Sequence, residues 1–100
     1  MITIREMNID DYDAMIHLWS NTPGMGLSAA DTPEQINRYL IRNSGCCYVA
    51  EDSTLSHPHS IVGTLLAGHD GRRAYLYHMA VATLDRGKGI ASQLIERSMK

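Results

Sequence analysis

Two glycines and two cations stand together near the end of the sequence, in a spacing suited to holding an anion. Residues 86–91 read Arg-Gly-Lys-Gly-Ile-Ala. Gly87 and Gly89 have no side chains, so backbone N–H groups at this point can close around an anion. The helix that we expect from Gly89 onward adds the unpaired amides and the partial positive charge of its first turn. With Arg86 and Lys88 beside them, these groups predict a phosphate-binding turn.

The spacing of this turn differs from that of two common phosphate-binding loops. A nucleoside-triphosphate loop needs Gly-x-x-x-x-Gly-Lys-Ser/Thr, and the sequence does not contain that spacing. A dinucleotide fingerprint needs a third Gly or Ala where Ser92 stands, within a parallel strand–helix–strand unit. Because the strand before this turn belongs to a predicted antiparallel hairpin, a nucleotide-dependent oxidoreductase is disfavoured.

The helices that precede this turn can be predicted from periodicity and from end signals. Asn8 can cap a first helix, whose apolar stripe runs to about residue 20. Residues 20–31 contain Pro and Gly without a strong periodicity, which predicts a loop. Thr32 followed by Pro33 predicts the start of a second helix, and that helix should stop before Gly45.

After the second helix the apolar period changes from helical to extended. Asp70-Gly71 is a strong hairpin signal between two apolar runs. From Ile90 the apolar residues recur at helical spacing again. We therefore expect strands at residues 2–4, 46–51, 60–69 and 74–82. The predicted fold is α+β, with the order strand, two helices, three strands, helix, and a mixed, mostly antiparallel sheet that has helices on both faces.

The residues around the turn resemble those of a known family. Arg86-x-x-Gly89-x-Ala91 resembles the Arg/Gln-x-x-Gly-x-Gly/Ala motif of the GNAT superfamily of acetyltransferases. The segment Tyr77-His78-Met79-Ala80-Val81 is similar to the strand that leads into this motif in the family. The resemblance covers the order of elements in essentially the whole chain, and it is most specific between Ile61 and Ile95.

The resemblance implies acetyl-CoA as cosubstrate, an amine as acceptor and no metal. Backbone groups of the strand would pair with the pantetheine arm, and amides of the turn would hold the pyrophosphate. The residues that it assigns to the cofactor are Met79, Ala80, Val81, Arg86, Gly87, Lys88, Gly89, Ile90, Ala91 and Ser92.

The same resemblance leaves the catalytic and acceptor residues as hypotheses. Some members carry a glutamate base at the strand position where this sequence has Tyr75. Our hypothesis is direct attack of a neutral amine on the thioester, with His78 or Tyr77 leading a water chain that removes the proton. The acceptor pocket is expected to include residues of the first helix and the following loop, namely Trp19, Met25 and Leu27.

We expect a single GNAT-like domain over residues 1–100, truncated after the cofactor-binding helix. Family members continue into a further strand, helix and hairpin, so the C-terminal part of the fold is expected to be absent. A homodimer, formed by exchange of a segment between protomers, is one expected way to complete the structure. The alternative function is a non-catalytic CoA-binding or oligomerising module.

Composition excludes several other classes of protein. The net charge of −2 and the dispersed Lys and Arg residues predict no nucleic-acid partner. No apolar run approaches the ~18 residues of a membrane span, and the first residues do not resemble a signal peptide, so no membrane association is expected. Cys46 and Cys47 are adjacent, which fits no usual metal spacing and predicts reduced thiols in a cytoplasmic protein.

Overall fold

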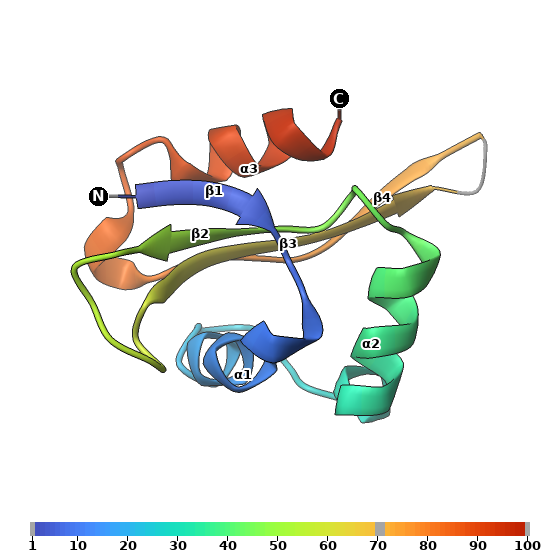
Figure 1. The fold of residues 1–100 in the computed structure, drawn as a ribbon, viewed down its shortest axis with the longest axis horizontal. Coiled ribbons are helices and arrows are strands. Elements are labelled where there is room, and N and C mark those ends of the chain that lie inside the picture. Colours follow the sequence, from blue (N-terminus) through green and yellow to red (C-terminus); the bar gives the residue numbers. More distant parts are fainter. Residues whose placement is uncertain (1, 70–71, 100) are drawn as a thin grey trace.

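The helices and strands follow one another in the predicted order. The computed structural model describes residues 2–69 and 72–99. In this part of the chain the elements are β1 (Ile2–Glu6), α1 (Tyr12–Ser20), α2 (Pro33–Arg42), β2 (Tyr48–Asp52), β3 (Ile61–His69), β4 (Ala74–Val81) and α3 (Ile90–Ser98). The predicted order of strand, two helices, three strands and helix is confirmed (Figure 1).

Local capping explains where the first two helices begin. The Asn8 side chain accepts a hydrogen bond from the Asp10 N–H at 2.9 Å, but it caps a short 3-10 turn, Ile9–Asp11, that leads into α1. Thr32 caps α2 as predicted, because its Oγ1 accepts from the Gln35 N–H at 3.3 Å and Pro33 occupies the first helical position.

The start of β2 and the loop before α2 differ from the prediction, and each difference has a local cause. β2 begins at Tyr48 and not at residue 46, because the Cys46 N–H bonds back to the Asn43 carbonyl in the turn that follows α2. The predicted loop at residues 20–31 contains a second 3-10 turn, Ala29–Asp31, capped by Ser28.

The four described strands form one sheet in the order β1-β2-β3-β4. Each pair of neighbours is antiparallel, so the part of the sheet that the structure describes is antiparallel throughout and not mixed. The hairpin between β3 and β4 is as predicted, although Asp70 and Gly71 lie outside the described residues.

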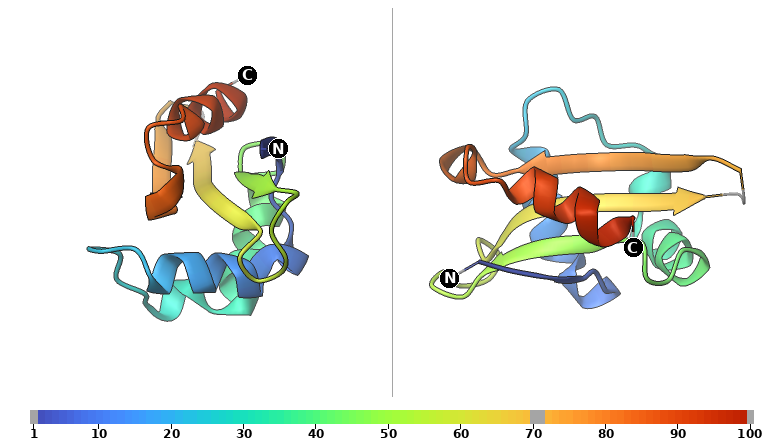
Figure 2. Two further views of the ribbon diagram at one scale, coloured as in Figure 1. Left: turned by 90° about the vertical axis from the view of Figure 1, so that its left-hand side faces the viewer. Right: turned by 90° about the horizontal axis from the view of Figure 1, so that it is seen from above.

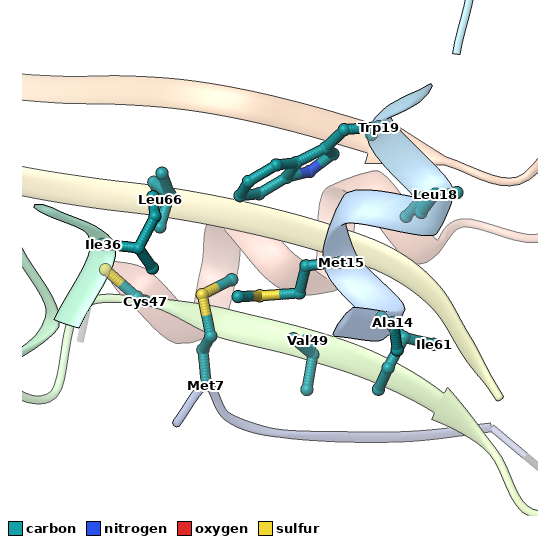
Figure 3. Close-up of a cluster of buried hydrophobic side chains, with 11 residues drawn as sticks. Met7, Ala14, Met15, Leu18, Trp19, Ile36, Cys47, Val49, Ile61 and Leu66 are labelled. Carbon is teal, nitrogen blue, oxygen red and sulfur yellow. The ribbon is translucent and has the colours of Figure 1, made fainter. Parts of the chain in front are cut away.

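Helices cover both faces of this sheet, as predicted. α1 and α2 lie on one face and α3 lies on the other (Figures 1 and 2). On the first face, Trp19 and Met15 of α1 pack with Val49 of β2 and Leu66 of β3 (Figure 3). On the second face, Ile90 and Leu94 of α3 are among the residues that pack on the other side of the strands. Burial of these apolar side chains fixes the positions of α1 and α3 relative to β4.

An irregularity in β4 interrupts the regular alternation of its side chains. Thr64 lies opposite Ala80, and Leu66 lies opposite Tyr77. A step of two residues along β3 therefore matches a step of three residues along β4, which defines a β-bulge at His78 and Met79. His78 has a φ of 50°, in the left-handed region that side-chain-bearing residues rarely adopt.

None of the helices within residues 2–69 and 72–99 has the length and apolarity that a membrane span requires.

Candidate active site

The glycine turn between β4 and α3 has the backbone geometry that an anion site needs. Gly87 and Gly89 have φ values of 84° and 77°, both in the left-handed region. Gly89 is also the N-cap of α3, and its carbonyl accepts the first helical bond, from the Gln93 N–H at 3.1 Å. The N–H groups of Ile90, Ala91 and Ser92 occupy the first helical turn, where no intrahelical acceptor exists. Together with roughly half a positive charge from the helix dipole, these amides are the kind of group that binds an anion.

The two cations of the turn are held in different ways. Lys88 Nζ lies 3.1 Å from Asp85 Oδ1, and the Asp85 side chain is only 10% exposed. The Arg86 Nε donates to the Val81 carbonyl oxygen at 3.4 Å, so the arginine bends back toward the end of β4. Arg86 and Val81 line the same hollow of about 140 Å³ as Gly87, Gly89 and the first turn of α3.

The turn is continuous with the free edge of β4. β4 is the last strand in the sheet order, with β3 as its neighbour. The Ala82 N–H donates to the Val62 carbonyl on β3 at 2.8 Å. Since backbone groups alternate in direction along an antiparallel strand, those of Val81 point away from β3, on the side where Arg86 reaches the Val81 carbonyl. At the bulge, this edge reaches His78.

Contacts from separate elements hold His78 in place. The Thr64 hydroxyl of β3 donates to the His78 carbonyl at 2.9 Å and accepts from Trp19 Nε1 at 2.8 Å. The indole of Trp19 on α1 packs against the His78 ring, with centroids 4.5 Å apart. His78 Nε2 lies 2.6 Å from Asp31 Oδ1, at the end of the 3-10 turn Ala29–Asp31.

His78 lines a cavity of about 420 Å³ between this 3-10 turn, α2 and β4. Tyr39 of α2 and Tyr77 of β4 meet edge to face in its wall, with ring centroids 6.3 Å apart. Burial raises the pKa of Tyr39 to about 12, so its phenol stays protonated at neutral pH. The cavity thus places a histidine, a carboxylate and two phenols around a space large enough for a small organic group.

Comparison with known proteins identifies the family. The sequence profile of the acetyltransferase (GNAT) family matches residues 12–100. A protein of Photorhabdus laumondii subsp. laumondii, named as an acetyltransferase, is 34% identical over 101 aligned positions, which cover 97% of this chain and 64% of that protein. A protein of Pectobacterium atrosepticum, also named as an acetyltransferase, is 36% identical over 98 positions, with the same two coverages of 97% and 64%.

The chain belongs to the GNAT acetyltransferase family. It spans 64% of the length of each of these two relatives. Among solved structures, the diaminobutyrate acetyltransferase of Paenibacillus lautus, in complex with L-2,4-diaminobutyric acid and coenzyme A, has the same fold. The TM-score is 0.79 at 21% identity, and the match covers 100% of this chain and 57% of that one.

The structure brings some of the predicted site residues of this GNAT chain together and separates others. Tyr77 and His78 both line the large cavity, and Tyr77 is 50% exposed. Trp19 is 0% exposed and is not among the residues that line the cavity. Its indole packs against the His78 ring instead. Met25 and Leu27 flank Gly26, which lines the cavity, but neither of them is among its lining residues.

Asp31 was not predicted as a site residue from the sequence. The sequence predicts a loop that ends at this residue, whereas its side chain is buried and bonded to His78. One signal was present, because Ser28 and Asp31 have the spacing of a capping box, with Asp in place of the usual Glu or Gln. That pattern predicts the 3-10 turn, but it does not predict a contact with a strand 47 positions away.

The turn and the β4 edge offer backbone groups of the kind that CoA needs. Within residues 2–69 and 72–99, no group of three His, Cys, Asp or Glu side chains is placed to hold a metal. The unpaired amides at the start of α3 and the free edge of β4 are the kinds of group that pair with a pyrophosphate and with an extended amide-bearing chain.

Proposed function

We propose that this protein is an acyl-CoA-dependent N-acetyltransferase that transfers the acetyl group of acetyl-CoA to an amine of a small molecule or a protein. One observation carries this proposal. The glycine turn, the outward edge of β4 and the His78 cavity follow one another along a single stretch of chain. A cofactor held at the turn and paired with β4 would present its thioester to the cavity.

In this proposal the turn and the strand bind different parts of the cofactor. The backbone amides of the turn, with the positive end of α3 and the flanking cations, hold the pyrophosphate. Outward-facing backbone groups of β4 pair with the amides of the pantetheine arm, as an added strand would. The assigned residues are Arg86, Gly87, Lys88, Gly89, Ile90, Ala91 and Ser92 for the pyrophosphate, and Met79 and Val81, with Ala80 between them, for the arm.

The cavity beside His78 is the proposed acceptor site. An amine with the ordinary lysine pKa of ~10.4 is almost fully protonated at pH 7, and exposing its lone pair costs about 4.6 kcal/mol. An α-amine with a pKa of ~7.8 costs only about 1 kcal/mol. Alignment of the amine and the thioester can contribute on the order of 7–11 kcal/mol. His78 removes the proton from the acceptor amine, and Tyr77 lies beside it in the cavity wall.

Binding of CoA by the intact protein tests this proposal first. A ligand at 100 times its Kd stabilises a protein by about 2.7 kcal/mol, which for a domain of this size raises Tm by about 10–20 °C. We expect such a rise with CoA or acetyl-CoA, and none with pantetheine, which lacks the pyrophosphate. Absence of any shift with either cofactor would overturn the proposal.

A second measurement separates the enzyme from a non-catalytic CoA-binding module. Release of free CoA thiol is followed with acetyl-CoA and a panel of small amines and of peptides with free N-termini or lysines. Amine-dependent release, with the acetylated amine detected by mass spectrometry, is the expected result. Binding of CoA without transfer to any member of the panel would favour the binding module.

A further inference from the structure

Asp31 is a buried carboxylate whose two oxygens have different partners. Its side chain is only 7% exposed. Oδ2 accepts the Ser28 N–H at 2.9 Å, which closes the 3-10 turn on itself. Oδ1 lies 2.6 Å from His78 Nε2. The first bond fixes the carboxylate within the turn, so the second bond can fix the histidine.

The bond to Asp31 determines which nitrogen of His78 carries the proton. A carboxylate only accepts hydrogen bonds, so Nε2 must be the protonated nitrogen of the neutral ring. Nδ1 then keeps its lone pair and is the nitrogen that can take up a proton. The hydrogen bond from Nε2 to Asp31 is kept when Nδ1 takes up this proton, so the ring stays in the same orientation.

The other contacts of His78 do not determine which ring nitrogen carries the proton. Thr64 bonds to the His78 backbone carbonyl, and Trp19 packs against its ring without a hydrogen bond to a ring nitrogen. Among the residues that line the cavity, the titratable groups facing His78 are Asp31, Tyr77 on its own strand and Tyr39 on α2. Of these, Asp31 is the one bonded to the imidazole.

We propose that Asp31 is the positioning residue of the acetyl-transfer site, holding His78 with its proton on Nε2 and its Nδ1 free to deprotonate the acceptor amine. This inference rests on the proposed function. The acceptor ammonium gives one proton to Nδ1, and the neutral nitrogen forms a bond to the thioester carbonyl carbon. The carbon–sulfur bond breaks, and its electron pair leaves with the sulfur. The nitrogen's second proton neutralises the CoA thiolate, and the proton on His78 passes to solvent.

The same geometry links the base to the acceptor loop. Asp31 ends the 3-10 turn whose residues Ser28 and Ala30 line the cavity, so the segment that would contact the acceptor also orients His78. The Tyr12 hydroxyl donates to the Asp31 carbonyl at 2.6 Å and ties this turn to α1. If the 3-10 turn moved away, the Asp31–His78 hydrogen bond that fixes the tautomer would be lost, and the cavity would open.

The substitution Asp31→Asn tests the proposal with almost no change of shape. The asparagine oxygen can still accept the Ser28 N–H, but its NH₂ group now faces Nε2 and donates to it. The proton of the neutral ring should therefore move to Nδ1. We expect the ¹⁵N spectrum of the intact protein to show His78 as the Nε2–H form in the wild type and as the Nδ1–H form in Asp31→Asn. Loss of the signal in His78→Gln assigns it.

Activity gives the second readout of the same variant. We expect kcat/KM to fall at least about tenfold in Asp31→Asn, towards the level of His78→Gln, because base catalysis typically contributes about 10²–10⁴-fold. The affinity for CoA should be unchanged, since Asp31 lies outside the cofactor turn. The pH dependence of kcat/KM should also change, which a purely structural role of Asp31 would not produce.

Two control variants separate positioning from local structure. Ser28→Ala removes the capping hydroxyl but leaves the carboxylate, so the Nε2–H form should persist. Asp13→Asn makes the same chemical change at an exposed position of α1 and should alter neither the tautomer nor the rate. An Nε2–H form that survives in Asp31→Asn, or full activity of that variant, would overturn the proposal. Absence of CoA binding by the wild type would instead overturn the proposed function, and with it the role of Asp31 in acetyl transfer. The ¹⁵N spectrum would still show whether Asp31 sets the tautomer of His78.

Discussion

At His78, an uncommon backbone conformation coincides with contacts from three other segments of the chain. Its φ of 50° belongs to a region that costs side-chain-bearing residues roughly 1–3 kcal/mol. Thr64, Trp19 and Asp31 each contact it, from β3, α1 and the 3-10 turn. Such a conformation persists where the surrounding structure enforces it, and these contacts are the enforcing groups. The residue type could be singled out from the sequence, but the bulge that directs its ring toward Asp31 could not.

Replacing His78 by glutamine should remove proton transfer while keeping a side chain of similar length. We expect kcat/KM to fall by about 10²–10⁴-fold and its pH–rate profile to lose the limb on which activity rises with pH. His57→Gln, which changes an exposed histidine of the β2–β3 connection, is the matched control and should behave as the wild type. An unchanged pH–rate profile in His78→Gln would exclude His78 as the base.

On the scale of elements, the signals that predicted the fold are local. The Thr32 cap, the change from helical to extended periodicity and the glycine turn each involve residues that are close in sequence. The pairing of Asp31 with His78 spans 47 positions. It depends on strand register, on the bulge and on the hydrogen bond that ties the 3-10 turn to α1. No short-range pattern encodes that combination, so the cofactor turn could be predicted and the histidine–aspartate pair could not.

A side chain at Gly89 should strain the turn before α3, because of the backbone angle there and not for lack of space. Its φ is 77°, and an added Cβ would meet only the end of the Gln93 side chain, at 4.0 Å. We expect Gly89→Ala to strain the turn by about 1–2 kcal/mol and, by rotating the amides, to weaken CoA binding about 5- to 30-fold in titration calorimetry.

Gly45 offers a matched control for this substitution. Its φ is 85° with open space around it, but it lies after α2, away from the proposed cofactor site. Gly45→Ala should therefore lower Tm about as much as Gly89→Ala does, but it should leave the affinity for CoA unchanged. Equal CoA affinities in the two variants would show that the glycine turn does not bind the cofactor.

For the molecule as a whole, the two helical layers decide which groups are withdrawn from water. α1 and α2 close one face of the sheet, and Cys47 lies beneath them at 2% exposure, next to the less buried Cys46. Burial raises the pKa of the Cys47 thiol to about 11, from 9.0 for the free group, while its Sγ–H donates to the Ala67 carbonyl at 3.4 Å.

This shift makes the stability of the fold depend on pH in the alkaline range. Above pH 9.0 the unfolded chain loses the Cys47 proton, whereas the folded chain keeps it until about pH 11. The unfolded state then binds fewer protons, so the free energy of unfolding falls as pH rises, by up to about 1.4 kcal/mol per pH unit. Below pH 9.0 this contribution to stability is fully present.

Urea unfolding of the intact protein under reducing conditions, at pH 8 and pH 10, checks this linkage. Between these two pH values Cys47 should account for a loss of about 1.3 kcal/mol, and the loss should disappear in Cys47→Ala. Taking the difference between the wild type and this variant removes most of the titration of other groups, including Tyr12 and Tyr39, whose pKa values are raised from 10.0 chiefly by burial. Parallel pH profiles for the two proteins would mean that water reaches the thiol, and hence that α1 and α2 do not close over this face of the sheet in solution.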